Sequence, residues 1–201
     1  MRKIAAGLFV SVDGVVEAPD TWTGPYFSPE LGQLIESMMD DGDTLLLGRV
    51  TYQGFAAAFG GQSGGMADRM NAFPKVVVST TLDRAEWQNS TLISGNVTEE
   101  ITKLKQRPGR NINMSGSGTL VTWLLRGGLL DQLDLLVFPV VVGHGKRLFA
   151  GEGGQAGLKL AGSQTFGSGV VHLTYPRADC CGGQPGRGPG PAPFPAGAAP
   201  S

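Results

Sequence analysis

The sequence has few cysteines, few histidines and no long apolar run. Its 201 residues include two cysteines, Cys180 and Cys181, and two histidines, His144 and His172. Adjacent cysteines cannot connect distant parts of a chain, and these four residues cannot assemble a Cys/His zinc site. The longest apolar run is interrupted by Pro139 and falls short of the roughly 18 residues that a membrane span needs. We therefore expect no disulfide framework, no metal, no membrane partner and a cytoplasmic setting.

Neither sign of charge is in excess. Lysine and arginine number 16 against 17 aspartates and glutamates, which gives a formal net charge of -1. This balance excludes a general attraction for nucleic acid, although it leaves room for a local phosphate site. Hydrophobic residues make up 41% of the chain and charged residues 16%, as in a globular domain.

Proline and glycine are unevenly distributed. Six of the 13 prolines lie between Pro185 and Pro200, where Phe194 is the only large apolar residue. Such a segment buries too little surface to offset its ordering entropy, so residues 178–201 are expected to form a disordered Gly/Pro-rich tail. A proline-rich docking ligand is the alternative. Residues 1–177 form the predicted domain.

Within residues 1–177, short apolar runs alternate with helical patterns. Strands are expected at 4–10, 44–47, 75–79, 91–94, 111–115, 135–142 and 170–175. Helices are expected after Ser28-Pro29-Glu30, from Thr98 and over 118–126. The alternation predicts an α/β fold with a mostly parallel central sheet. Because no helix separates the last strand from a partner near 158–160, we expect an antiparallel C-terminal edge.

The segment 45–52 is the clearest candidate for anion binding. A buried strand ends in Gly48, followed by Arg49 and by Thr51 at the start of a helix. Free N–H groups at a helix start attract anions, glycine allows close approach, and arginine adds a forked charged donor. The alternative is an ordinary strand-to-helix turn with a surface arginine.

A second strand runs into a Gly/Ser-rich turn and then a helix. Its backbone donors and hydroxyls suit a pyrophosphate and belong to Gly116, Ser117, Gly118, Thr119 and Leu120. The turn is neither the dinucleotide fingerprint nor a P-loop, because the third glycine and the GKS/T ending are missing. A plain helix start is the alternative. Both turns are predicted to share one edge of the parallel sheet, where ligands of α/β proteins bind.

Two weaker signals follow other strands. Ser79, Thr80 and Thr81 offer hydroxyls to a ribose or a 2′-phosphate, or form a simple polar turn. Asp13, beside Gly14, would orient a substrate or handle a proton, or belong to an ordinary Asp-Gly turn.

Two loops have open interpretations. Lys146 and Arg147 either meet a phosphorylated substrate or lie in a solvated turn. Trp22, Tyr26 and Phe27 either line a pocket for a planar substrate, which we favour slightly, or cover the core.

The order of these segments resembles a known family. The pieces are SVDG after the first strand, Gly48-Arg49-x-Thr51-Tyr52, NINMSGSGTL, and DQLDLLVFPVVVGHGKRLF before a final strand pair. They resemble the dihydrofolate-reductase-like family, which includes the reductase domain of bacterial bifunctional deaminase-reductases of riboflavin biosynthesis. The resemblance covers nearly all of residues 1–177.

The resemblance implies a three-layer fold with an eight- or nine-stranded sheet, and NADPH as cofactor. By analogy, Gly48, Arg49 and Thr51 hold the adenosine-side phosphates, while residues 79–81 border the adenine ribose and its 2′-phosphate. Residues 116–120 wrap the pyrophosphate, and Asp13 lies near the nicotinamide and the substrate. It further implies a homodimer, with the apolar segment 135–142 as a possible interface.

The leading functional hypothesis is a cytoplasmic NADPH-dependent reductase of a small pterin- or pyrimidine-like heterocycle. One alternative is a catalytically silent nucleotide-binding or sensor protein on the same fold. It is suggested by Glu30 and Glu36, neither of which clearly aligns with the pterin-binding carboxylate of dihydrofolate reductases. A structural dimerisation domain is the third. The reductase hypothesis requires Arg49 and Gly118 to lie on the same side of the molecule.

Overall fold

The computed structural model describes residues 1–150, 156–177 and 194. Its eight strands are β1 (Ile4–Ser11), β2 (Gly42–Gly48), β3 (Lys75–Val78), β4 (Ser90–Ile93), β5 (Asn111–Ser115), β6 (Gln132–Phe138), β7 (Gly162–Thr165) and β8 (Val171–Pro176). Five α-helices accompany them: α1 (Pro29–Asp40), α2 (Arg49–Phe59), α3 (Gly65–Ala72), α4 (Val97–Gln106) and α5 (Gly118–Arg126). Two 3-10 turns, η1 (Pro19–Thr21) and η2 (Gly24–Tyr26), precede α1.

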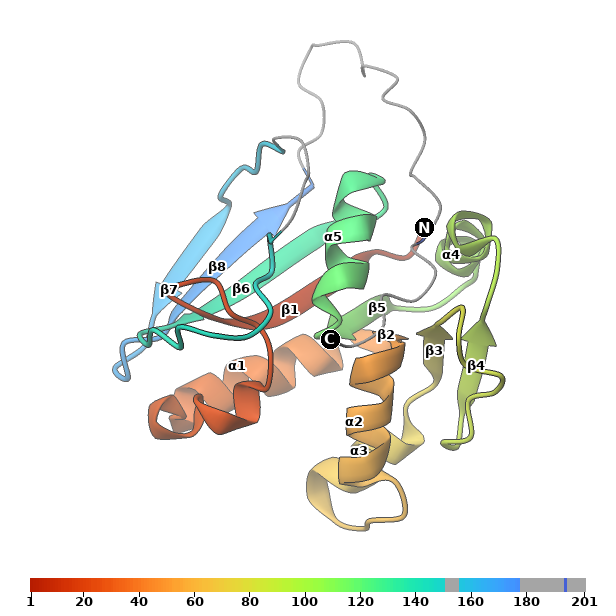
Figure 1. The fold of residues 1–201 in the computed structure, drawn as a ribbon. Coiled ribbons are helices and arrows are strands. Elements are labelled where there is room, and N and C mark those ends of the chain that lie inside the picture. Colours follow the sequence, from red (N-terminus) through yellow and green to blue (C-terminus); the bar gives the residue numbers. More distant parts are fainter. Residues whose placement is uncertain (151–155, 178–193, 195–201) are drawn as a thin grey trace.

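All eight strands belong to one sheet, in the order β4-β3-β2-β5-β1-β6-β8-β7. The first six of these run parallel, while β8 is antiparallel to β6 and to β7. The predicted parallel sheet with an antiparallel C-terminal edge is therefore confirmed (Figure 1).

Helices cover both faces of the sheet, which gives three layers. On one face, α4 and α5 pack on β1, β3 and β5 through residues such as Ile101 and Leu124. On the other face lie α1, α2 and α3, with Leu31, Tyr52 and Met70 in contact with the strands. The strands are continuous apolar runs in the sequence because successive side chains point to opposite faces of the sheet, and helices cover both faces. Figure 1 shows the two helical layers on opposite sides of the sheet.

The helix boundaries follow from local chemistry. Ser28 caps α1, since its Oγ accepts the Leu31 N–H at 3.3 Å, and Pro29 occupies the first turn. Gly128, with a φ of 64°, follows the end of α5. The predicted helix start at Ser28-Pro29-Glu30 and the predicted helix over 118–126 are confirmed.

Two predicted strands are shifted in the structure, and one helix was not predicted. The sixth strand spans Gln132–Phe138 instead of 135–142, because Pro139 cannot donate to the ladder. The partner of the last strand is Gly162–Thr165 instead of 158–160, and it is exposed throughout, so it has no apolar pattern. Helix α3 was not predicted because glycine starts it and few apolar residues follow.

The predicted disordered tail, 178–201, lies outside the described residues except for Phe194. The ring of Phe194 packs edge-on against Trp123 of α5, with centroids 5.5 Å apart. Among the described helices, none combines the length and the apolarity needed to cross a membrane.

Candidate functional site

The predicted site residues lie at one edge of the sheet, where the parallel strands end. Gly48, at the end of β2, pairs with Val78, so Ser79 follows at the same edge. The end of β5 reaches this edge from the other side of β2, and β1 extends past it to Ser11. The segments after four different strands therefore converge, as the ends of parallel strands must.

The two glycine-rich turns are in direct contact through Ser117. Its Oγ accepts the Gly48 N–H at 2.7 Å and donates to Thr51 Oγ1 at 2.8 Å. A Cβ atom on Gly116 would come within 3.2 Å of the Thr51 side chain, so the turns pack closely. Gly48, Thr51, Gly116 and Ser117, which were singled out as two separate signals, form one corner.

Two helices begin at this corner without side-chain caps. The starts of α2, after Gly48, and of α5, after Ser117, receive no hydrogen bond from their N-cap side chains. The first N–H groups of a helix have no partner inside it and lie at the positive end of its dipole. The backbone N–H groups of Gly118 and Thr119 are therefore hydrogen-bond donors at the start of α5. Leu120 contributes its N–H alone, because its side chain is buried in the core.

Arg49 and the turn after β3 flank the corner. The half-exposed Arg49 side chain donates to Gln53 Oε1 at 3.3 Å. Ser79 is buried, and its Oγ accepts the N–H groups of Thr81 and Leu82, each at 3.1 Å. Its oxygen thus shapes the turn, whereas Thr80 and Thr81 are exposed at the surface.

Asp13 holds a neighbouring loop. Its Oδ1 accepts the N–H of Val142 at 3.0 Å and the Ser11 hydroxyl at 2.7 Å, while Oδ2 accepts the N–H of Gly143 at 2.9 Å. Arg147 donates from Nε to the Asp13 carbonyl at 2.9 Å and forms an ion pair with Oδ2 at 3.4 Å. Both carboxylate oxygens are therefore occupied by loop groups.

These contacts set the charge of Asp13. The Ser11 hydroxyl, followed by the N–H groups of Val142 and Gly143, holds the pKa of the carboxyl well below its usual range. Such a group is a fixed anion at neutral pH, which suits orientation of the loop better than proton transfer.

The sequence analysis did not identify the isolated antiparallel bridge that follows Asp13. Val15 bridges Arg147, Val16 donates its N–H to the Lys146 carbonyl at 2.9 Å, and Glu17 Oε2 accepts the Lys146 N–H at 3.0 Å. We call residues 13–17 and 142–148 the latch. The short VVE and KRL stretches were the only sequence signal for it. Arg147 thus forms its contacts within the latch, and His144 is exposed.

The latch also contacts the corner. A Cβ atom on Gly118 would lie 3.3 Å from Val16 and 3.6 Å from Leu148, and the Leu148 carbonyl accepts the Thr122 hydroxyl at 3.0 Å. Glycine at position 118 therefore lets the latch pack on the first turn of α5. Asp13 is connected to the corner through this packing.

The aromatic loop before α1 covers the core more than it lines a pocket. Trp22 is buried and packs edge-on against Phe138, with centroids 5.6 Å apart, and Tyr26 contacts the same ring. Phe27, 48% exposed, is the most exposed member of this group.

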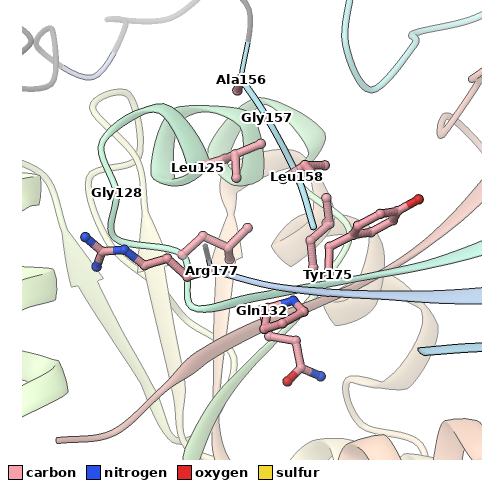
Figure 2. A pocket seen from close by; sticks show the side chains of 11 residues that line it. Leu125, Gly128, Gln132, Ala156, Gly157, Leu158, Tyr175 and Arg177 are labelled. Atoms are coloured by element: carbon pink, nitrogen blue, oxygen red, sulfur yellow. The ribbon is translucent and has the colours of Figure 1, made fainter. Parts of the chain in front are cut away.

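A small hollow lies at the opposite edge of the sheet. It has a volume of about 150 Å³ and is lined by the end of α5, the start of β6 and the end of β8, including Leu125, Gln132 and Tyr175 (Figure 2). None of the predicted site residues lines it, so it is separate from the corner.

The acidic run 40–43 is used in ion pairs. Asp43 pairs with Arg2, and Asp40 contacts Arg69 at 2.5 Å. Within the described ranges, no group of three or more His, Cys, Asp or Glu side chains is arranged to hold a metal.

Comparisons with known proteins agree with this fold. The uncharacterized protein YyaP of Bacillus subtilis is 30% identical over 182 residues, covering 87% of this chain and 94% of that protein. The structure of a putative riboflavin biosynthesis protein from Shewanella sp. PV-4 superposes with a TM-score of 0.72 at 20% identity, over 88% of this chain and 99% of that one. Enterococcus faecalis dihydrofolate reductase, solved with NADP(H), gives a TM-score of 0.59 at 18% identity, over 88% and 97%.

These structural likenesses show a dihydrofolate-reductase-like fold, as the resemblance implied. The family model of the RibD C-terminal domain matches residues 2–172, nearly the whole of the predicted domain. This match supports a reductase-type activity. The chain therefore belongs to the RibD C-terminal domain family.

Proposed function

We propose that this protein is a cytoplasmic NADPH-dependent reductase of a small pterin- or pyrimidine-like heterocycle. The observation that supports it most is the contact between Gly48 and Ser117, which joins two uncapped helix starts into one anion-binding corner. Arg49 and Gly118 then belong to the same side of the molecule, as a dinucleotide site requires.

The residues present fit a dinucleotide. Backbone N–H groups of Arg49, Val50 and Thr51 and of 118–120 would hold its phosphates, with Arg49 as a charged donor. Exposed Thr80 and Thr81 would border the adenine ribose. The cofactor supplies hydride chemistry when bound, while the protein orients it and the substrate. Asp13 would fix the latch beside the nicotinamide and the heterocycle.

The test is binding and turnover of NADPH. We expect the wild-type protein to bind NADPH and to oxidise it, followed at 340 nm, with at least one heterocycle from a pterin and pyrimidine panel. Absence of NADPH binding would contradict the proposal.

A second function is favoured by the state of Asp13. Because the pKa of Asp13 is strongly lowered, its carboxyl group carries no proton to donate at neutral pH. No other proton donor is identified among the described residues of the site. Tight binding of NADPH without turnover on the whole panel would instead indicate a nucleotide-binding or sensor protein.

We further propose a homodimer. The segment 135–142 does not provide the interface as a strand, because β6 lies between β1 and β8 and Leu136 and Phe138 are buried. Exposed apolar side chains after the end of β6 are better candidates, notably Val141 at 70% and Phe149 at 54% exposure. Light scattering at micromolar concentration should give twice the mass of 21.0 kDa.

A further inference from the structure

Ser117 has a backbone conformation that normally selects glycine. Its φ of 62° and ψ of 57° are left-handed, which is sterically unfavourable for a residue with a Cβ atom. Gly116, just before it, also has a positive φ of 81°. A glycine at position 117 would adopt this geometry without strain. A serine in this conformation is explained if interactions of its side chain offset the strain.

The Ser117 hydroxyl joins the starts of two helices. It accepts the N–H of Gly48, the N-cap of α2, and donates its hydrogen to Thr51, in the first turn of the same helix. Ser117 is itself the N-cap of α5. A Cβ atom at position 48 would lie 3.0 Å from Ser117 Oγ, closer than an ordinary van der Waals contact, so glycine at this position favours the close approach of the two turns.

Of these two bonds, the one to Thr51 occupies the hydroxyl hydrogen, which is the only group that the Ser117 side chain could donate to a phosphate. A serine hydroxyl has one hydrogen, and Thr51 already takes it. The remaining lone pair is an acceptor and would repel a phosphate oxygen. The Gly48 N–H is also occupied.

We propose that Ser117 is a positioning residue that fixes the starts of α2 and α5 relative to each other, rather than a phosphate ligand through its side chain. The inference rests on the proposed dinucleotide site. Holding both sets of free N–H groups in place before the ligand arrives reduces the ordering that binding must impose. Affinity therefore depends on a hydroxyl that does not touch the ligand.

The central test is Ser117→Gly, which removes the hydroxyl and the backbone strain together. We expect the dissociation constant for NADPH, measured by fluorescence titration, to rise about tenfold, from the loss of two hydrogen bonds. The melting temperature should stay within a few degrees of the wild type. A purely structural role would lower the melting temperature and leave the dissociation constant unchanged. Ser63→Ala, at an exposed serine before α3, is the matched control.

A double-mutant cycle separates positioning from direct contact. Thr51→Val removes the partner of the Ser117 hydroxyl but keeps the Thr51 N–H. If the pair acts as one unit, Ser117→Ala, Thr51→Val and the double variant should weaken NADPH binding by similar factors. Additive losses would mean that the Ser117 hydroxyl contacts the ligand directly, and would overturn the proposal.

The bridge can also be measured without ligand. In Ser117→Gly, the Gly48 amide should exchange with solvent about tenfold faster than in the wild type, because its acceptor is gone. Unchanged exchange together with unchanged NADPH affinity would overturn this inference alone. A wild-type protein that does not bind NADPH would overturn the proposed function, while the exchange rate would still report on the bridge.

Discussion

The two edges of the parallel sheet differ in whether the protein itself supplies partners for their polar groups. At the edge where the strands begin, buried charges have protein partners: Lys75 Nζ donates to the carbonyls of Asn71, Phe73 and Gln88, and Lys105 pairs with Asp131 at 2.5 Å. At the edge where the strands end, α2, α4 and α5 start without a hydrogen bond from an N-cap side chain. Polar groups completed by the protein stabilise the fold, whereas donors left open are available to a ligand.

Breaking an ion pair at the first edge should have the largest effect. Asp131→Ala leaves the Lys105 ammonium, whose side chain is 6% exposed, without its carboxylate and removes the acceptor of the Ile4 N–H. We expect a loss of about 3 kcal/mol in the free energy of unfolding, measured by urea denaturation. NADPH affinity of the folded protein should not change.

The matched control is Glu86→Ala, which breaks an exposed pair with Arg84. It should leave stability unchanged. If Asp131→Ala were equally silent, the contrast between the two edges would be lost.

At the second edge, removing a charge should affect binding and not stability. Arg49→Ala should weaken NADPH about 30-fold, the effect of losing a charged hydrogen bond. NADH should be affected less if Arg49 reaches the 2′-phosphate, whereas equal losses would place it on the pyrophosphate. Titrations with both nucleotides separate these results. Arg107→Ala, at an exposed position after α4, is the control, and no loss at Arg49 would remove it from the site.

Loss of Asp13 should increase hydrogen exchange in the latch several-fold. In Asp13→Ala the amides of Val142 and Gly143 lose their acceptors, so their hydrogen exchange should accelerate several-fold. Asp20→Ala, exposed nearby, should not change it. If turnover is found, Asp13→Asn should not remove an ionisation between pH 5 and 9 from the rate profile. The loss of such an ionisation would make Asp13 the proton-transfer group.

The latch also has a predicted pH range. The folded-state pKa of Asp13 lies far below its ordinary value of 3.8, so the carboxylate favours folding at every pH above about 4. That contribution disappears as the pH falls toward the folded-state value. Protection of the Val142 and Gly143 amides, corrected for intrinsic exchange, should therefore be constant from pH 8 to 5.

The smallest effect concerns Lys75. Burial lowers its pKa from 10.5 to about 8, so above pH 8 the folded protein releases a proton that the unfolded chain retains. Stability should therefore rise with pH, by less than about 1 kcal/mol between pH 7 and 8.5. Lys75→Met should remove this slope, and Lys3→Met, at an exposed lysine, should not. An identical slope in Lys75→Met would show that Lys75 keeps its ordinary pKa.

The sequence predicted the parallel sheet and singled out the residues that lie together at the corner, because both leave local signals. Apolar runs ending in glycine predict a buried strand followed by a helix start, and the ends of parallel strands meet at one edge. The strand Gly162–Thr165 was misplaced because it is exposed on both faces, so its residues show no alternation.

What the sequence could not predict depends on contacts between distant residues. Asp13 and Val142 are 129 positions apart, and the Asp-Gly pair gives no indication of which loop the carboxylate holds. Likewise, Ser117 was expected to wrap a pyrophosphate. Its hydroxyl bonds to Gly48 and Thr51 follow only from the packing of β2 against β5.

The central claim is that the corner formed by Gly48 and Ser117 binds a dinucleotide through the starts of α2 and α5. An NADPH titration of the ¹⁵N-labelled protein, followed amide by amide, tests it most directly. We predict saturable shifts at 49–51 and 118–120, and none at Lys75, Lys105 or Asp131. Shifts that cluster around the hollow near Leu125 and Tyr175, or no shifts at all, would contradict the account.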